Sequence, residues 1–245
     1  MTLAQLLFSQ GFGTRRECAA LIAHGLVGLD GTEGAIDDPE HDLGAPARLR
    51  FRVRGETWPY HARALVVLHK PPGYECSLKP KHHPSVHGLL PAPLRTRGVQ
   101  AIGRLDADTS GVLLFTDDGA LVHRLTSPKR HVPKVYEVGC KHPVDAALRE
   151  RLLAGVLLHD ENQTVRASAC EATGERTLRL TLTEGKYHQV KRMVAAAGNR
   201  VEALHRSAFG PIGLDGLAVG TWRWADADAD FPARPRSQEP LETGP

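Results

Sequence analysis

The sequence predicts a mixed α+β protein, because short strand-like runs and short helical segments both occur along its 245 residues. Continuous apolar runs bounded by turn residues indicate buried strands at 65–68 and 112–115. Apolar residues three or four apart indicate a helix over 15–24 and a second helix that follows the turn at 184–185 and ends near Gly198. A chain of this length holds one large or two modest domains, and 41% hydrophobic residues are enough for a substantial core.

The N-terminal part predicts a small unit of helices followed by a strand. Thr14 and Glu17 have the spacing of a capping box, so a helix is expected to begin directly after Thr14. Residues 26–31 then indicate a strand and a turn. Arg15 and Arg16 place positive charge at the start of the helix, where free backbone amides already favour phosphate.

The next segment alternates arginine with apolar residues. Residues 48–54 predict a strand with four arginines on one face, which indicates either a polyanion-binding surface or a solvated outer strand. Residues 56–63 have little periodicity and predict a linker. Residues 65–70 then form a buried strand that ends in a turn at 71–74.

Residues 103–119 are the most informative part of the chain, because they bring a carboxylate into a tight loop that enters an apolar strand. That carboxylate is Asp106, and a brief helix over 120–126 is expected after the strand. An aspartate in a loop most often bonds nearby backbone. Working side chains, however, also lie on loops held by rigid elements. The local pattern leaves both interpretations open.

A third segment predicts a strand over 178–183, a turn, and a helix that ends near Gly198. On this helix His188, Lys191 and Arg192 gather on the side opposite to the apolar stripe. Such a basic face is either solvated or part of a charged site. The apolar stripe consists of Val190, Met193, Val194 and Ala197.

Composition excludes several classes of protein. No apolar run has the length of a membrane span, the N-terminus lacks a signal-peptide pattern, and the four cysteines are widely separated. We therefore expect a cytoplasmic, monomeric protein with reduced thiols and no contact with a membrane. The histidines in residues 79–87 suggest a metal site, but their proline-rich loop favours an RNA-facing segment, and no metal is expected.

Three segments, in the same order along the chain, resemble the signatures of pseudouridine synthases of the RsuA/RluB/E/F family. Residues 103–111 read Gly-Arg-Leu-Asp-x-x-Thr-Ser-Gly. Residues 134–138 resemble the Lys-x-Tyr-x-Val strand of that family. Residues 184–193, Glu-Gly-Lys-Tyr-His-Gln-Val-Lys-Arg-Met, resemble its third motif. The segment that begins at His69, His-Lys-Pro-x-Gly-Tyr-x-Cys, resembles most closely the enzymes that act on the small ribosomal subunit.

The resemblance implies the domain organisation. Residues 1–55 are expected to form an S4-like RNA-binding domain, followed by a linker over 56–63. Residues 64–231 are expected to form a catalytic domain with a mainly antiparallel mixed sheet and flanking helices. Residues 232–245 are rich in proline and charge, and we expect them to be a disordered tail.

The resemblance also implies the activity, which is isomerisation of a uridine to pseudouridine in ribosomal RNA without a cofactor. The expected substrate is 16S RNA or a small-subunit assembly intermediate. The alternatives are 23S RNA as substrate, or a non-catalytic S4-type assembly factor. A metal-dependent hydrolase remains a further alternative, whereas a serine hydrolase is disfavoured because the chain has no Gly-x-Ser-x-Gly motif.

The same resemblance assigns roles to individual residues. Asp106 is the expected nucleophile, attacking either ribose C1′ or uracil C6, and the Lys191 cation is expected to keep it ionised. Tyr136 is expected to stack on the uracil and to remove the C5 proton. Arg104 either fills the gap left by the flipped base or forms a structural salt bridge. The further RNA contacts are expected from Lys134, Arg192, His188, Arg15 and Arg16.

Overall fold

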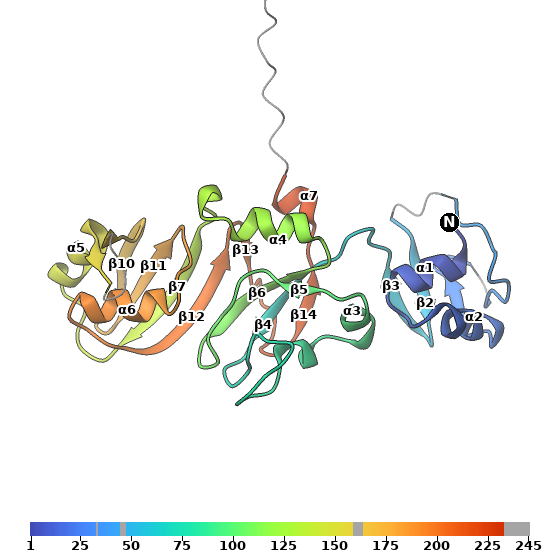
Figure 1. Ribbon diagram of the computed structural model, residues 1–245, viewed down its shortest axis with the longest axis horizontal. Coiled ribbons are helices and arrows are strands. Elements are labelled where there is room, and N and C mark those ends of the chain that lie inside the picture. Colours follow the sequence, from blue (N-terminus) through green and yellow to red (C-terminus); the bar gives the residue numbers. More distant parts are fainter. Residues whose placement is uncertain (33, 45–47, 159–163, 233–245) are drawn as a thin grey trace, which may run out of the picture.

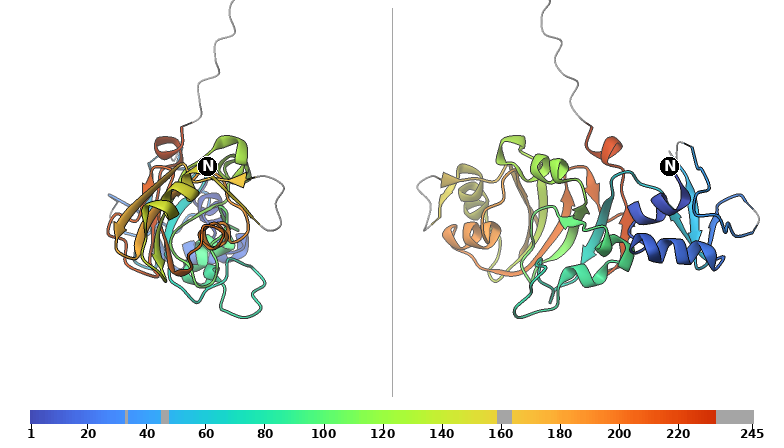
Figure 2. Two further views of the ribbon diagram at one scale, coloured as in Figure 1. Left: turned by 90° about the vertical axis from the view of Figure 1, so that its left-hand side faces the viewer. Right: turned by 45° about the vertical axis from the view of Figure 1, so that its right-hand side comes forward.

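The computed structural model describes residues 1–32, 34–44, 48–158 and 164–232. A small N-terminal module, which we define as the described residues up to Tyr60, lies at one end of an elongated molecule (Figure 1). The module keeps this position when the molecule is turned (Figure 2, right). The rest of the chain is built on one long mixed sheet with helices on its faces, so the predicted mixture of helices and strands is confirmed.

Two helices pack on a three-stranded antiparallel sheet in the N-terminal module. The predicted capping box is present, since the Thr14 backbone N–H donates to Glu17 Oε2 at 2.7 Å and the Glu17 N–H donates to Thr14 Oγ1 at 3.3 Å. The elements are α1 (Leu3–Ser9), α2 (Arg15–Ala23), β1 (Val27–Leu29), β2 (Arg50–Val53) and β3 (Glu56–Pro59). Their buried residues are Leu3, Leu6, Leu7, Cys18, Ile22, Val27, Phe51 and Val53.

The arginine-rich strand is shorter than the sequence predicts. Arg48 and Arg54 adopt positive φ angles of 67° and 51° in the turns that flank β2. Only Arg50 and Arg52 therefore project from the outer face of the strand. Arg50 Nε lies 3.2 Å from Oδ2 of Asp30, and Arg52 is tied to a nearby backbone carbonyl. The four-arginine face is thus reduced to two arginines with local partners.

The predicted linker at 56–63 begins with a strand instead. Gly55 has a φ of 84°, which lets the chain turn back so that β3 pairs with β2. Trp58 on β3 packs edge-on against Phe12, with ring centroids 5.4 Å apart. The segment appeared irregular in the sequence because a strand of four residues shows almost no alternation.

The large sheet has the strand order β10-β11-β7-β12-β6-β4-β14, with β5 beside β6 and β13 beside β12. Every pair in it is antiparallel except β12 with β6. A mainly antiparallel mixed sheet was predicted, and it is confirmed. The strands are β4 (Leu65–Lys70), β5 (Gln100–Ala101), β6 (Ser110–Thr116), β7 (Lys134–Cys140), β10 (Ala169–Gly174), β11 (Thr177–Leu182), β12 (Val201–Phe209), β13 (Ile212–Gly213) and β14 (Trp222–Trp224). A separate pair is formed by β8 (Val156–Leu157) and β9 (Thr164–Val165).

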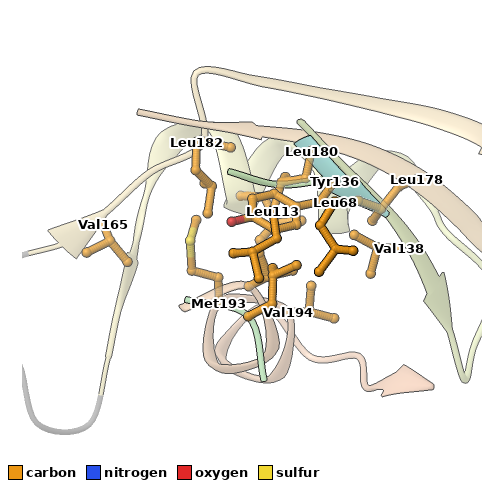
Figure 3. Close-up of a cluster of buried hydrophobic side chains, with 14 of the residues drawn as sticks. Leu68, Leu113, Tyr136, Val138, Val165, Leu178, Leu180, Leu182, Met193 and Val194 are labelled. Atoms are coloured by element: carbon orange, nitrogen blue, oxygen red, sulfur yellow. The ribbon is translucent and has the colours of Figure 1, made fainter. Parts of the chain in front are cut away.

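Alternate residues of β4 and β6 enter different cores, because successive side chains of a strand point to opposite faces. On one face α6 (Gln189–Ala196) buries Met193 and Val194 against the sheet (Figure 3). On the other face α4 (Gly119–Thr126) buries Leu121 and Leu125. The remaining helices are α3 (Ala92–Thr96), α5 (Ala146–Ala154), α7 (Ala227–Asp230) and the 3-10 turns η1 (Val86–Leu89) and η2 (Pro128–Arg130).

The parallel pair of strands depends on a glycine. Gly111 has a φ of 112°, and a Cβ atom placed on it would lie 2.2 Å from the backbone oxygen of Arg206. No other residue allows β6 and β12 to approach so closely. This contact sets the end of the loop that carries Asp106 directly against β12.

A polar clamp joins the N-terminal module to the large sheet. The side chain of Arg97 is buried and donates to Asp117 Oδ2 at 2.7 Å, to Gln10 Oε1 at 2.8 Å and to the His61 carbonyl at 2.9 Å. The predicted tail falls almost wholly on residues 233–245, which lie outside the described residues. No helix in the described part of the chain is long and apolar enough to cross a membrane.

Candidate active site

A buried lysine fixes the loop that carries Asp106. Lys70 is fully buried at the end of β4, and its ammonium donates to the backbone carbonyls of Asp106 at 3.0 Å and Thr109 at 2.8 Å. It also donates to the carbonyls of Ala107 and Pro71. Burial lowers the pKa of Lys70, and the carbonyl oxygens compensate for the lost hydration. The main chain of the loop is therefore fixed from below.

The two side-chain oxygens of Asp106 each face a nitrogen atom. Lys191 Nζ lies 3.2 Å from Oδ2, and His188 Nε2 lies 3.2 Å from Oδ1. His188 is the N-cap residue of α6, and Lys191 lies in the first turn of that helix. The structure thus brings together three residues that the sequence analysis selected. The Asp106 side chain remains 28% exposed and open to a substrate.

Asp108 is a second carboxylate of the site, and the sequence analysis missed it. Lys191 Nζ lies 2.7 and 2.8 Å from its two oxygens, closer than to Asp106. The hydrogen bond from Lys191 lowers the pKa of Asp108. Burial lowers the pKa of Lys191, but the bonds to Asp108 and Asp106 outweigh burial and raise it. Lys191 is therefore a protonated bridge between two carboxylates. The signal in the sequence that could have revealed Asp108 is its position two residues after Asp106 in the same short loop.

Tyr136 lies on β7 and is aligned with the end of the Asp106 loop. It pairs with Arg206 of β12, which in turn pairs with Gly111 of β6. The ring is 9% exposed and packs in the core beside the sheet residues (Figure 3). Its hydroxyl forms no hydrogen bond with a residue that the structure describes.

The remaining residues selected near the site differ in their surroundings. Arg104 is exposed and forms no salt bridge with any residue that the structure describes, which removes the structural alternative for it. Lys134 Nζ donates to the Val132 carbonyl at 3.0 Å, and burial lowers the pKa of Lys134 to about 8. Arg192 Nη1 donates to the Tyr187 carbonyl at 3.3 Å.

Arg15 and Arg16 are not part of this site, because they lie on α2 of the N-terminal module. Both side chains are exposed. The Arg15 guanidinium lies 4.9 Å from the ring centroid of Phe8. From this position the two arginines can contact a large ligand, but they do not join Lys191 in contacting Asp106.

The carboxylate of Glu75 organises the histidine-rich loop. Glu75 accepts hydrogen bonds from the backbone N–H groups of Lys81, His82 and His83. His87 lies apart, with its ring 5.2 Å from that of Phe115. Within residues 1–32, 34–44, 48–158 and 164–232, no group of three or more histidines, cysteines, aspartates or glutamates could hold a metal ion.

Comparison of the sequence with known protein families shows the family of this chain. The sequence model of the family described as RNA pseudouridylate synthase matches residues 64–196, which include Asp106, Tyr136 and Lys191. The chain belongs to this family. Pseudouridine synthases are isomerases, so the chain is an RNA-modifying isomerase.

Close relatives of this pseudouridine synthase occur among curated proteins. The ribosomal small subunit pseudouridine synthase A of Escherichia coli (strain K12) is 41% identical over 186 residues, which cover 76% of this chain and 77% of that protein. The uncharacterized RNA pseudouridine synthase YtzG of Bacillus subtilis (strain 168) is 40% identical over 228 residues, or 91% of this chain and 94% of that protein. A crystal structure of a pseudouridylate synthase superimposes with a TM-score of 0.64 and 29% identity, over 94% of this chain and 97% of that one.

Proposed function

We propose that this pseudouridine synthase isomerises one uridine of small-subunit ribosomal RNA, with Asp106 as the nucleophile. The observation that carries the proposal is the pairing of both Asp106 oxygens with nitrogen atoms, on a loop that Lys70 fixes from below. A nucleophilic carboxylate must stay ionised inside a pocket filled by a base, and the adjacent ammonium of Lys191 favours the ionised form.

The reaction needs neither an oxidant nor a reductant. The bond between uracil N1 and ribose C1′ breaks, the base turns, and a new bond forms between C5 and C1′. The proton that leaves C5 is balanced by the proton that N1 gains. Asp106 attacks either C1′ or C6, and both routes use the same carboxylate. No cofactor is required by this balance.

Tyr136 and Arg104 complete the proposed mechanism. We assign the Tyr136 ring to stacking on the uracil, and its hydroxyl is the candidate to accept the C5 proton. A uridine within folded RNA must leave its helix before Asp106 can reach it. The exposed guanidinium of Arg104, which forms no salt bridge with the described residues, is the candidate to occupy the space that the uridine leaves.

The small-subunit substrate is supported by the relatives whose names specify that subunit. We propose that the N-terminal module acts as an S4-like RNA-binding domain, with Arg15 and Arg16 directed at phosphates. Residues 64–231 are then the catalytic domain. The proposed acting form is a monomer that binds ribosomal RNA or a small-subunit assembly intermediate.

The test is to map pseudouridine in ribosomal RNA before and after incubation with the purified protein. Carbodiimide-dependent stops of reverse transcription are expected to appear at one position of small-subunit RNA and not with the Asp106→Asn variant. Stops found only in large-subunit RNA would show that large-subunit RNA is the substrate. Binding without any new stop would indicate an RNA-binding assembly factor instead of an enzyme.

A further inference from the structure

Tyr187 lies at the site, and the mechanism above does not use it. Its side chain is 73% exposed, although a large aromatic ring normally gains free energy from burial. The ring stacks on the imidazole of His188, with centroids 3.8 Å apart and planes inclined by 20°. That imidazole also contacts Asp106 through Nε2. The Tyr187 ring therefore lies one side chain away from the carboxylate, with one face covered and the other open to solvent.

The turn that presents this ring is fixed by hydrogen bonds. His188 has a φ of 47°, a left-handed conformation that costs free energy in a residue other than glycine. The buried amide of Gln189 stabilises the turn, because it accepts from the Lys186 N–H and donates to Glu184 Oε1, each at 2.8 Å. These hydrogen bonds thus fix the backbone of the turn that carries Tyr187.

We propose that Tyr187 is the stacking platform for the RNA base adjacent to the flipped-out uridine, an inference that rests on the function proposed above. Each nucleic acid base has a π face, so an exposed aromatic ring binds a base of any sequence. The flipped uridine occupies the space at Asp106. The base that comes within reach of the Tyr187 ring is therefore that of the nucleotide bonded directly to this uridine in the RNA chain. His188 supports the covered face of the platform and links it to the carboxylate.

Steady-state kinetics on a hairpin RNA that contains the target uridine tests this role. Tyr187→Ala is expected to raise KM about tenfold while kcat stays near the wild-type value, because a stacked base contributes to binding and not to bond breaking. Tyr187→Phe keeps the ring and is expected to match the wild type. The control is Val219→Ala, which removes a comparably exposed apolar side chain, 61% exposed, from another loop. An unchanged KM for Tyr187→Ala, or a loss confined to kcat, overturns the proposal.

A fluorescent base gives a direct readout of the stacking. With 2-aminopurine on the 5′ or the 3′ side of the target uridine, the wild type and Tyr187→Phe are expected to quench its fluorescence at one of the two positions. Tyr187→Ala is expected to lose that quenching, and equal quenching by all three proteins overturns the inference. A wild-type protein that forms no pseudouridine in the unlabelled hairpin overturns the proposed function instead, so the two failures are distinguishable.

Discussion

The active-site loop and the N-terminal module use their charged residues in opposite ways. At the loop, Lys191 of α6 contacts the two carboxylates at 2.7 to 3.2 Å, and Lys70 of β4 is buried among backbone carbonyls. In the module, Arg15 and Arg16 are exposed on the first turn of α2. Charges fixed within a site act on bonds that change during a reaction, whereas exposed charges act on a polyanion at longer range.

This difference predicts that the two regions separate in kinetics. Substitutions in the loop are expected to lower kcat with little effect on the salt dependence of RNA binding. Substitutions in the module are expected to raise KM and to change that salt dependence. The predictions below test the separation, beginning with the largest expected effect.

Asp106→Asn is expected to lower kcat by at least about 10⁴-fold, because the amide is a poor nucleophile of nearly the same shape. RNA affinity is expected to stay within a few-fold, since the variant removes negative and not positive charge. Single-turnover kinetics and a filter-binding titration measure the two quantities separately. A variant that keeps wild-type turnover would show that Asp106 is not the nucleophile.

Lys70→Met tests whether the loop depends on its support. The substitution leaves several buried carbonyls without a donor, so we expect it to reduce the free energy of unfolding by about 2–4 kcal/mol. It is also expected to lower kcat by disordering the backbone of Asp106. Lys129→Met is the control, because it removes the same charge from an exposed position. Equal unfolding midpoints in urea for both variants would contradict the proposed support.

Lys191→Met removes the bridge between the two carboxylates. We expect kcat to fall about 10²- to 10³-fold, the usual effect of losing one electrostatic partner in an active site. Lys191→Arg retains the charge and is expected to recover part of the loss. Asp108→Asn removes the competing carboxylate and is expected to change kcat much less, since the contact between Lys191 and Asp106 remains. A larger loss of kcat for Asp108→Asn than for Lys191→Met would reverse the proposed roles.

The sequence predicted those parts of the fold and of the site that depend on a short-range pattern or on a family motif. The capping box of Thr14 and Glu17 is an example of the first kind, because its two partners are three residues apart in one helix. The contact between Asp106 and Lys191 is an example of the second kind. The helix that ends near Gly198 was also predicted with its buried face, since the spacing of its apolar residues determines that face.

The rest depends on contacts between distant segments. Lys70 belongs to a strand that reads as apolar, and nothing in its neighbours shows that four carbonyls converge on its ammonium. Asp108 competes for Lys191 only because the loop and α6 meet in space. The strand β3 escaped prediction because its pairing with β2 and the packing of Trp58 on Phe12 stabilise it, not its own sequence pattern.

Arg15→Ala combined with Arg16→Ala tests the other side of the comparison. If each arginine neutralises one phosphate, the slope of log affinity against log salt is expected to decrease by about 1.4 to 1.8, while kcat is unchanged. Arg50→Ala combined with Arg52→Ala is the matched control, because these arginines have local partners in the fold. Equal slopes for the two double variants would show that exposed arginines of α2 have no special part in RNA binding.

The smallest expected effect is a pH dependence at Lys134, whose pKa burial lowers from 10.5 to about 8. The ammonium loses its proton as the pH rises through 8, so RNA affinity is expected to fall about two- to fivefold between pH 7 and 9 if Lys134 contacts a phosphate. Lys134→Arg keeps its charge and is expected to show no such fall. Stability changes in the opposite direction, because the unfolded chain binds the proton more strongly. The free energy of unfolding of the wild type relative to Lys134→Met is therefore expected to rise between about pH 8 and 10.5. An affinity that falls equally in Lys134→Arg would place the titrating group elsewhere.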